Sequence, residues 1–248
     1  ADEFVVAERS PWEIDLEETE VKEIPPAPTL PVAGDGWVVA RAEDFKQLVA
    51  LKRHLTGLDG GFIAGGLFKN IFNGEPIKDV DIFFETEDQW AAAVAKLRKK
   101  KSGFKEIYEN PRVVAFIEPV EGVRIELIGG VTDPEFGTNP VEFGSVHDTL
   151  SLFDFTITKF ALAKLENEGG ETWYAMYHAK FFEHLQLKRI SIDAGMVKPL
   201  STFERVLRYT GYGYRLCRDS KIKLIHELQG TEFEDDAQLS ASFYDGID

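Results

Sequence analysis

Two carboxylates stand two residues apart in an otherwise apolar run of the sequence. The run reads Asp79-Val80-Asp81-Ile82-Phe83-Phe84, and its composition predicts a strand. On a strand, residues i and i+2 point to the same side, so Asp79 and Asp81 would lie side by side. Adjacent carboxylates repel each other unless a cation bridges them, and hard oxygen ligands favour Mg²⁺. The pair therefore predicts a divalent-metal site at Asp79 and Asp81.

A third carboxylate, Glu126, falls within the apolar run Val123–Ile128, which predicts another strand. An acid in the middle of such a strand is costly unless it is paired or binds a metal. We therefore favour a catalytic role for Glu126 together with Asp79 and Asp81. The alternative is a solvent-facing strand residue near Arg124.

A glycine pair, Gly65-Gly66, follows the apolar run Gly61–Ala64 and precedes a helix predicted over residues 67–72. Glycines let the backbone approach phosphate closely, and a helix start presents free N–H groups. With Lys69, this pattern predicts a cradle for a nucleoside triphosphate. Such a cradle and metal-binding carboxylates are what phosphoryl or nucleotidyl transfer requires. A tight turn beside an exposed strand end is the alternative.

The elements that would position these residues alternate between helix and strand. Helices are predicted over 42–55, 67–72 and 89–101, and strands over 60–64, 80–84, 113–117 and 123–128. From about residue 149 the pattern favours helices, over 155–165, 173–187 and 202–209. The predicted fold class is therefore α/β then α: a mixed sheet with flanking helices, followed by a smaller helical domain.

Charge is concentrated at the two ends of the chain, whose net charge is −15. Residues 1–35 hold ten acids and two bases, and residues 229–248 hold six acids and no Lys or Arg. We therefore divide the chain into an acidic, Pro-containing arm (1–40), an α/β domain (41–145), a helical domain (146–228) and an acidic tail (229–248). The ends are either solubilising tails or, because apolar residues lie among the acids, extensions that bind a protein partner.

Composition limits where the protein is expected to act. No apolar run is long enough to span a bilayer, so no membrane association is expected. The single cysteine, Cys217, excludes an intramolecular disulfide framework and fits a reducing, cytoplasmic setting. We interpret Cys217 as a buried or incidental residue rather than a reactive thiol.

The run from Gly65 to Ile82 resembles the signature of CCA-adding enzymes and bacterial-type poly(A) polymerases. It has the glycine pair, a basic residue at Lys69, a turn closed by Gly74, and then Lys-Asp-x-Asp-Ile. Residues 153–162 look like the family's Arg-Arg-Asp-Phe-Thr-Ile-Asn motif, and residues 198–214 look like its Pro-Leu and Arg-x-x-Arg helix. The resemblance covers roughly residues 43–215 and implies a nucleotidyltransferase palm of the polymerase-β type.

The resemblance implies transfer of a nucleoside monophosphate from ATP or another NTP to an acceptor hydroxyl, with release of pyrophosphate. It implies two Mg²⁺ ions at Asp79 and Asp81, with Glu126 completing one metal site. It also implies nucleotide contacts, made by Gly65, Gly66, Lys69, Asp154, Arg205 and Arg208. The acceptor would be an RNA 3′ end, a protein side chain or a small molecule.

The chain departs from the family pattern at three places. Asn70 stands where the family has an acid, Leu152-Phe153 replaces the arginine pair before Asp154, and no Glu-Asp-x-x-Arg segment follows Arg208. Divergent nucleotidyltransferases of phages or mobile elements would look like this. The departures also leave open an inactive protein of the same fold, which would act as a structural or interaction protein through its acidic ends.

Two basic clusters are candidates for RNA binding. Residues 96–105 hold six bases and no acid, and the stretch from Arg205 to Lys223 holds six bases with three interleaved tyrosines. For the first cluster, the alternative is a solvated helix end, where cations are favourable. For the second, it is an amphipathic helix whose Tyr and Arg residues form core and rim.

Overall fold

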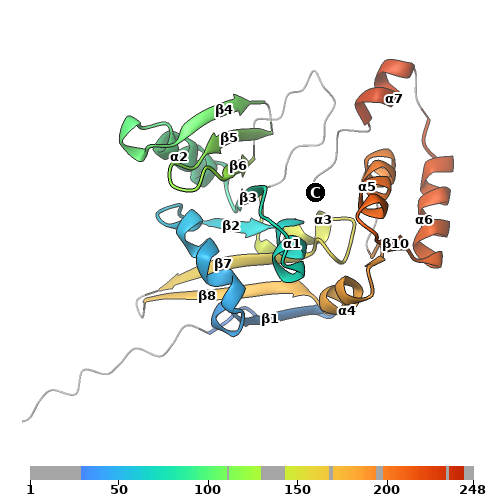
Figure 1. Ribbon diagram of the computed structural model, residues 1–248, viewed down its shortest axis with the longest axis horizontal. Helices are drawn as coiled ribbons and strands as arrows, with labels where there is room; N and C mark the ends of the chain where they lie inside the picture. The colour runs from blue at the N-terminus through green and yellow to red at the C-terminus, as the bar shows by residue number, and fades with distance from the viewer. Residues whose placement is uncertain are drawn as a thin grey trace, which may run out of the picture.

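The computed structural model describes residues 29–110, 112–129, 143–167, 170–193, 198–232 and 235–242. In this part of the chain, eight strands form one mixed sheet in the order β1-β8-β7-β2-β3-β6-β5-β4 (Figure 1). The strands are β1 (Trp37–Arg41), β2 (Gly61–Ala64), β3 (Asp79–Phe84), β4 (Lys105–Glu109), β5 (Val113–Ile117), β6 (Arg124–Ile128), β7 (Phe160–Asn167) and β8 (Gly170–His178). Neighbours are antiparallel except β3 and β6, which are parallel. The predicted mixed sheet is thus confirmed.

Helices flank the sheet and continue beyond it. They are α1 (Leu67–Asn73), α2 (Glu87–Leu97), α3 (Val146–Leu152), α4 (Phe181–Gln186), α5 (Pro199–Gly211), α6 (Arg218–Gln229) and α7 (Asp236–Ser242). Three 3₁₀ segments in the described residues are η1 (Ala42–Asp44), η2 (Lys46–Leu55) and η3 (Lys100–Ser102). Two short strands, β9 (Arg189–Ile190) and β10 (Arg215–Leu216), pair in parallel. Local sequence explains several boundaries. A capping box of Thr86 and Gln89 starts α2, and Gly74, with φ of 70°, ends α1.

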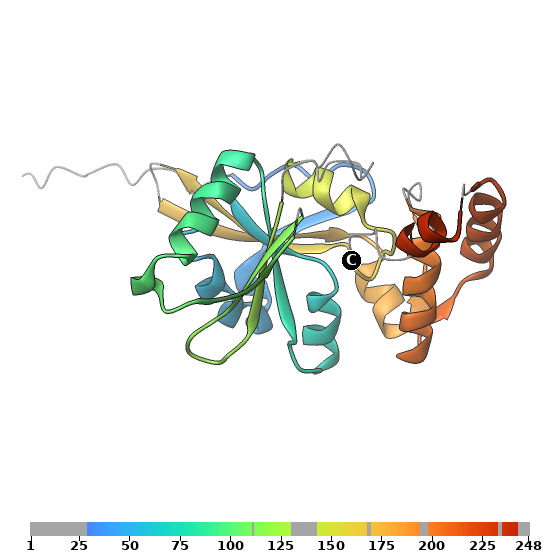
Figure 2. The same cartoon turned by 90° about the horizontal axis from the view of Figure 1, so that it is seen from above.

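The two faces of the sheet bury different residues, and this decides where the carboxylates point. Val80 and Ile82 of β3 join the core with η2 and α1, whereas Phe83 packs with residues of α3. Figure 2 shows α1 and α3 on opposite sides of the sheet. Because side chains alternate along a strand, Asp79 and Asp81 lie on the same side as Phe83.

An aromatic cluster joins α1 and α4 to the sheet. The ring of Phe160 on β7 lies 4.5 Å from Phe68 of α1, 5.1 Å from Tyr177 of β8 and 5.0 Å from Phe181 of α4, measured between centroids. Phe68, Phe160 and Phe181 are fully buried. Aromatic pairs at these separations stabilise by about 0.5–1.5 kcal/mol beyond their buried area. The cluster therefore holds α1, which begins at the glycine pair, firmly against β7.

The predicted helices over 155–165 and 173–187 are wrong, because these segments contain β7 and β8, with α4 only at the end of the second. Ala161, Leu162 and Ala163 are all buried, so this strand shows no alternation of polar and apolar residues. A strand covered on both faces cannot be told from a buried helix by its pattern. The predicted helix over 202–209 lies within α5 and is confirmed.

The predicted division at residue 145 is not reproduced by the sheet. β7 and β8 come from the predicted helical domain. β7 pairs with β2 of the predicted α/β domain, and β8 pairs with β1, most of which falls in the predicted arm. A separate helical domain over 146–228 is therefore not confirmed. Most of the predicted N-terminal arm lies outside the described residues, but Trp37–Arg41 forms β1. No helix in the described ranges is long and apolar enough to cross a membrane.

Candidate active site

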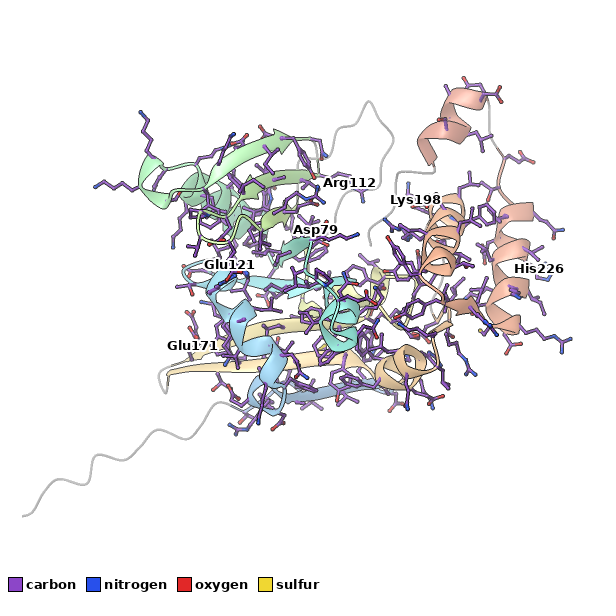
Figure 3. All side chains as sticks on the ribbon, in the orientation of Figure 1. Asp79, Arg112, Glu121, Glu171, Lys198 and His226 are labelled. Carbon is purple, nitrogen blue, oxygen red and sulfur yellow. The ribbon has the colours of Figure 1, made fainter. Side chains whose placement is uncertain are left out.

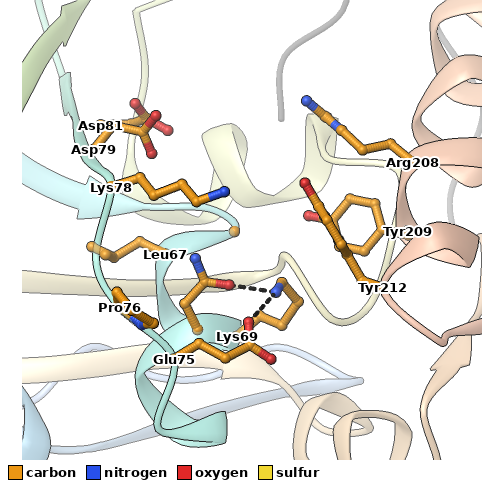
Figure 4. A pocket seen from close by; sticks show the side chains of 12 residues that line it. Leu67, Lys69, Glu75, Pro76, Lys78, Asp79, Asp81, Arg208, Tyr209 and Tyr212 are labelled. Atoms are coloured by element: carbon orange, nitrogen blue, oxygen red, sulfur yellow. Dashed lines mark hydrogen bonds and ion pairs between the residues drawn. The ribbon is translucent and has the colours of Figure 1, made fainter.

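A cleft of about 420 Å³ lies between the α1–β3 region and α5. In Figure 4, Asp79 and Asp81 stand on one wall, and Arg208, Tyr209 and Tyr212 stand on the wall opposite. Figure 3 shows Asp79 in the middle of the molecule, on the side that faces α5. The lining residues are Gly66, Leu67, Lys69, Asn70, Glu75, Pro76, Lys78, Asp79, Asp81, Arg208, Tyr209 and Tyr212. Five residues predicted for the site thus lie on this cleft, namely Gly66, Lys69, Asp79, Asp81 and Arg208.

The carboxylates are positioned by the parallel pairing of β3 with β6. Its register sets Asp79 opposite Arg124 and Asp81 opposite Glu126. Nη2 of Arg124 donates to Oδ2 of Asp79 over 2.5 Å, and its Nε lies 2.9 Å from Oε1 of Glu126. The Tyr108 hydroxyl, from β4, donates to the same Oε1 over 2.8 Å. Glu126 thus stands beside Asp81, as predicted from the strand, but is engaged by two neighbours.

The electrostatics keep both of these donors protonated. Burial lowers the pKa of Arg124, but the hydrogen bond to Asp79 and the charges of Glu126 and Asp79 outweigh it, so that this pKa is raised. Burial, with the hydrogen bond to Glu126, raises the pKa of Tyr108 to about 12. Both groups therefore remain donors to carboxylates across the physiological range.

The donor set fits a divalent cation at Asp79 and Asp81 better than at all three acids. Asp79 keeps a side-chain exposure of 39%, whereas that of Glu126 is 14%. Within the described ranges, no three His, Cys, Asp or Glu side chains converge as a metal-binding group. Two adjacent carboxylates at an open cleft suit Mg²⁺, which commonly binds one or two carboxylates plus substrate phosphates.

The glycine pair serves two different geometric needs. Gly65 has φ of 104°, a conformation that residues with a side chain rarely adopt, and its N–H donates to the Phe160 carbonyl over 3.1 Å. Gly66 lies against α5, where a Cβ would stand 3.0 Å from the hydroxyl oxygen of Tyr209. The first glycine therefore permits the turn into α1, and the second permits the close approach of α5. Gly65 itself is not among the residues that line the cleft.

Lys69 is a buried cation at the base of the cleft, with an exposure of 4%. Its Nζ donates to Oδ1 of Asn70 and, over 3.1 Å, to Oε2 of Glu75. The rings of Tyr209, Tyr212 and Tyr214 surround it, with centroids 5.4–5.9 Å away. Burial lowers the pKa of Lys69 despite the opposing effect of Glu75. Asn70 thus contacts this ammonium group, at the position where the family that the sequence resembles has an acid.

Asp154 and Arg205, both predicted to contact the nucleotide, contact each other. Their exposures are 6% and 7%, and Nη2 of Arg205 donates to Oδ2 of Asp154. Nη1 of Arg205 also donates to Oγ of Ser201, one turn earlier on α5, over 2.9 Å. Neither residue is among those that line the cleft. The pair ties α5, which carries Arg208 and Tyr209, to the segment before β7.

The basic clusters differ in their relation to the cleft. Lys96, Lys99 and Lys101 line a second depression of about 730 Å³ with residues 57–59, at the opposite end of β2 from the glycine pair. Lys96 donates to the Gly57 carbonyl over 2.5 Å, and Arg98 pairs with Glu106 and Glu109. Of the second cluster, Arg208 lines the cleft.

Arg124, the charged partner of the carboxylates, was not predicted as a residue of the site. It stands two residues before Glu126, so the same alternation that paired Asp79 with Asp81 sets Arg124 and Glu126 on one face. The hydroxyl of Tyr108 had no local signal, because β4 reaches Glu126 only across β5.

The mixed sheet with its flanking helices is similar to the fold of CCA-adding enzymes, as solved structures show. A CCA-adding enzyme in complex with ATP matches with a TM-score of 0.53 and 18% identity, over 83% of this chain and 50% of that chain. The complex of a CCA-adding enzyme with CTP matches with a TM-score of 0.53 and 16% identity, over 77% of this chain and 47% of that chain. The apo form I of a CCA-adding enzyme matches with a TM-score of 0.51 and 17% identity, over 77% of this chain and 46% of that chain. The chain thus spans about half the length of these structures, and the resemblance to CCA-adding enzymes is confirmed for the fold.

Residues 41–188 match the model of the Gad2 family, described as Gabija anti-defense 2 family protein. That match covers more than half of the sequence, and the chain belongs to this family. No curated protein sequence shows significant similarity to the chain.

Proposed function

We propose that this chain is a metal-dependent nucleotidyltransferase, which moves a nucleoside monophosphate from an NTP to an acceptor hydroxyl and releases pyrophosphate. The observation that supports this best is the shared cleft. Asp79 and Asp81 stand on one wall of it, with Lys69 and Arg208 as positive charges around the remaining space. Paired carboxylates and cations around one cavity suit a triphosphate together with its divalent ion.

Each residue has a defined part in this proposal. Asp79 and Asp81 hold Mg²⁺, which would neutralise negative charge on the phosphates when bound. Lys69 and Arg208 bind the triphosphate, and Gly66 leaves space for its approach. The predicted roles of Gly65, Asp154 and Arg205 become positioning roles, because these residues shape the turn into α1 and fix α5.

The family description supplies the biological setting of the proposal. We propose that nucleotidyl transfer by this chain serves the anti-defence role against Gabija that the family is named for. The acceptor stays within the predicted classes: an RNA 3′ end, a protein side chain or a small molecule. An RNA acceptor would contact Arg208 at the cleft, whereas Lys96, Lys99 and Lys101 lie at the other end of the sheet.

A label-transfer assay tests the activity. Purified protein is incubated with NTPs labelled at the α-phosphate, Mg²⁺, and an extract of cells that carry Gabija. We expect label in one acceptor fraction with the wild type, loss of at least about two orders of magnitude with Asp79→Asn, and full transfer with Asp88→Asn. Asp88 is a matched control, because it is an exposed acid in the first turn of α2, away from the cleft.

Two results would overturn the proposal: absence of transfer to any RNA, protein or small acceptor, or equal transfer by Asp79→Asn and wild type. Expression of the same variants in cells that carry Gabija tests the biological role. If Asp79→Asn relieves the defence as well as wild type does, then binding replaces transfer as the basis of that role. That result would favour the inactive protein of the same fold, acting through its acidic ends.

A further inference from the structure

Four charged side chains form a two-by-two block on one face of the sheet. Asp79 and Asp81 come from β3, and Arg124 and Glu126 come from β6. The parallel register sets Asp79 opposite Arg124 and Asp81 opposite Glu126. Alternation along each strand directs all four to the same side. The block therefore contains three acids and, at the corner beside Asp79, one built-in cation.

The guanidinium of Arg124 contacts two of the three acids. It donates to Asp79 over 2.5 Å, and its Nε lies 2.9 Å from Oε1 of Glu126. Within the described part of the chain, this Nε is buried without a well-directed hydrogen bond, so its link to Glu126 is one of charge. Tyr108 donates to the same oxygen of Glu126 over 2.8 Å. Oε1 of Glu126 therefore already has two partners, the Tyr108 hydroxyl and the Arg124 guanidinium.

The charge balance agrees with this geometry. Three carboxylates and one guanidinium leave two negative charges, which one divalent cation neutralises. A second divalent ion beside Glu126 would lie next to a guanidinium that cannot give up its proton under ordinary conditions. At separations of a few ångströms, such like charges repel each other even when partly screened.

We propose that the block holds a single divalent cation at Asp79 and Asp81, and that Arg124 takes the place of a second metal ion. This inference rests on the proposed nucleotidyltransferase function and revises the two-ion site that the family resemblance implied. Arg124 is a positioning residue: its fixed charge orients Asp79 and Glu126. Glu126 anchors the guanidinium instead of binding metal.

Manganese binding tests the inference without an acceptor or turnover. Electron paramagnetic resonance measures free and bound Mn²⁺, first with the protein alone and then with a non-hydrolysable NTP analogue. We expect one Mn²⁺ per wild-type chain, with no magnetic coupling between bound ions. Arg124→Met should bind the first ion about tenfold more tightly, because a neighbouring positive charge is removed. With the analogue it should bind a second ion, coupled to the first at about 3.5–4 Å.

Two further variants control for the source of the second ion. Arg124→Met combined with Glu126→Gln should return to one ion, because the ligand for the second ion is lost. Arg53→Met should behave as wild type, since it removes an arginine from a surface pair with Glu121, where Nη1 and Oε1 are 2.6 Å apart. Circular dichroism and thermal unfolding establish that each variant is folded before it is titrated.

Two coupled ions in the wild type, or an Arg124→Met variant that binds Mn²⁺ as the wild type does, would overturn the inference while leaving nucleotidyl transfer possible. Failure to bind the NTP analogue would instead count against the proposed function. In that case the titration of protein alone still decides the role of Arg124, through the change in affinity for the first ion.

Discussion

Arg205 and Asp154 form an ion pair in which both side chains are almost completely buried, and this pair joins α5 to the segment before β7. The helix so anchored carries Arg208 and Tyr209 and is followed directly by Tyr212, and these three residues form one wall of the cleft. The geometry of that wall therefore depends on two residues that do not line it.

Replacing one member of this pair should be strongly destabilising. Asp154→Ala leaves the Arg205 guanidinium buried without its charged partner, which costs about 3–5 kcal/mol in comparable cases. Urea unfolding followed by circular dichroism measures the free energy of unfolding. Glu43→Gln is the control, because the Glu43 side chain is exposed where it pairs with Lys52, and such pairs contribute about 0–1 kcal/mol. A loss with Asp154→Ala no larger than that of the control would contradict the anchoring role.

The two glycines should respond differently to alanine. Gly65→Ala forces a side chain into a conformation with φ of 104°, at a cost of about 1–3 kcal/mol in stability. Gly66→Ala has no such conformational cost, but its Cβ would stand 3.0 Å from the Tyr209 hydroxyl. Thermal unfolding and NTP affinity should show that Tyr209→Phe partly rescues Gly66→Ala and does not rescue Gly65→Ala. Equal rescue of both variants would contradict this division of roles.

How much of this site the sequence predicts depends on whether the signal is local. The facing of Asp79 and Asp81 follows from alternation within one strand, and the glycine pair stands where a strand turns into a helix. Arg124 joins the block through the register between β3 and β6, which no local pattern specifies. The pairing of Asp154 with Arg205 spans 51 positions and requires α5 to be placed first.

The fold was less predictable in its second half for a related reason. β7 lies between β2 and β8 and is covered on both faces, so its apolar run carries no alternation. Ala and Leu in that run also favour helices in isolation. Pairing with neighbouring strands overrides that preference, because propensity is a weak guide against tertiary contacts.

The buried Lys69 should give nucleotide affinity an unusual dependence on pH. Burial lowers the pKa of Lys69, so its ammonium loses its proton at a lower pH than an exposed lysine does. As pH rises through this lowered pKa, NTP affinity should fall. Calorimetric titration between neutral and alkaline pH measures this fall. Lys69→Met should bind the NTP about 10–100-fold more weakly at neutral pH. In this variant, NTP affinity should no longer fall at alkaline pH through loss of the Lys69 proton.

Lys69→Arg provides the control, because a guanidinium stays protonated throughout this range. It should retain much of the affinity and lose the fall at alkaline pH. If Lys69→Arg shows the same fall as wild type, then another group is responsible and Lys69 does not bind the triphosphate as a cation.

Tyr212 should support the base of the bound nucleotide by stacking. Its side chain is 52% exposed and lines the cleft opposite Asp79. Stacking on an aromatic ring contributes about 1–3 kcal/mol per base and tolerates every base. Tyr212→Ala should therefore weaken ATP, CTP, GTP and UTP by similar factors, roughly 5–150-fold, in fluorescence or calorimetric titrations. Tyr212→Phe should bind all four nearly as well as wild type, since the ring is retained.

Leu207→Ala is the matched control for Tyr212→Ala. Leu207 is an exposed apolar residue on α5, the helix that Tyr212 directly follows, and does not line the cleft, so its removal should leave all four affinities unchanged. A loss confined to one nucleotide in Tyr212→Ala would show that this residue reads a base edge instead of stacking. Equal losses in Leu207→Ala and Tyr212→Ala would attribute the effect to α5 as a whole, because Leu207 neither lines the cleft nor carries a ring that could stack.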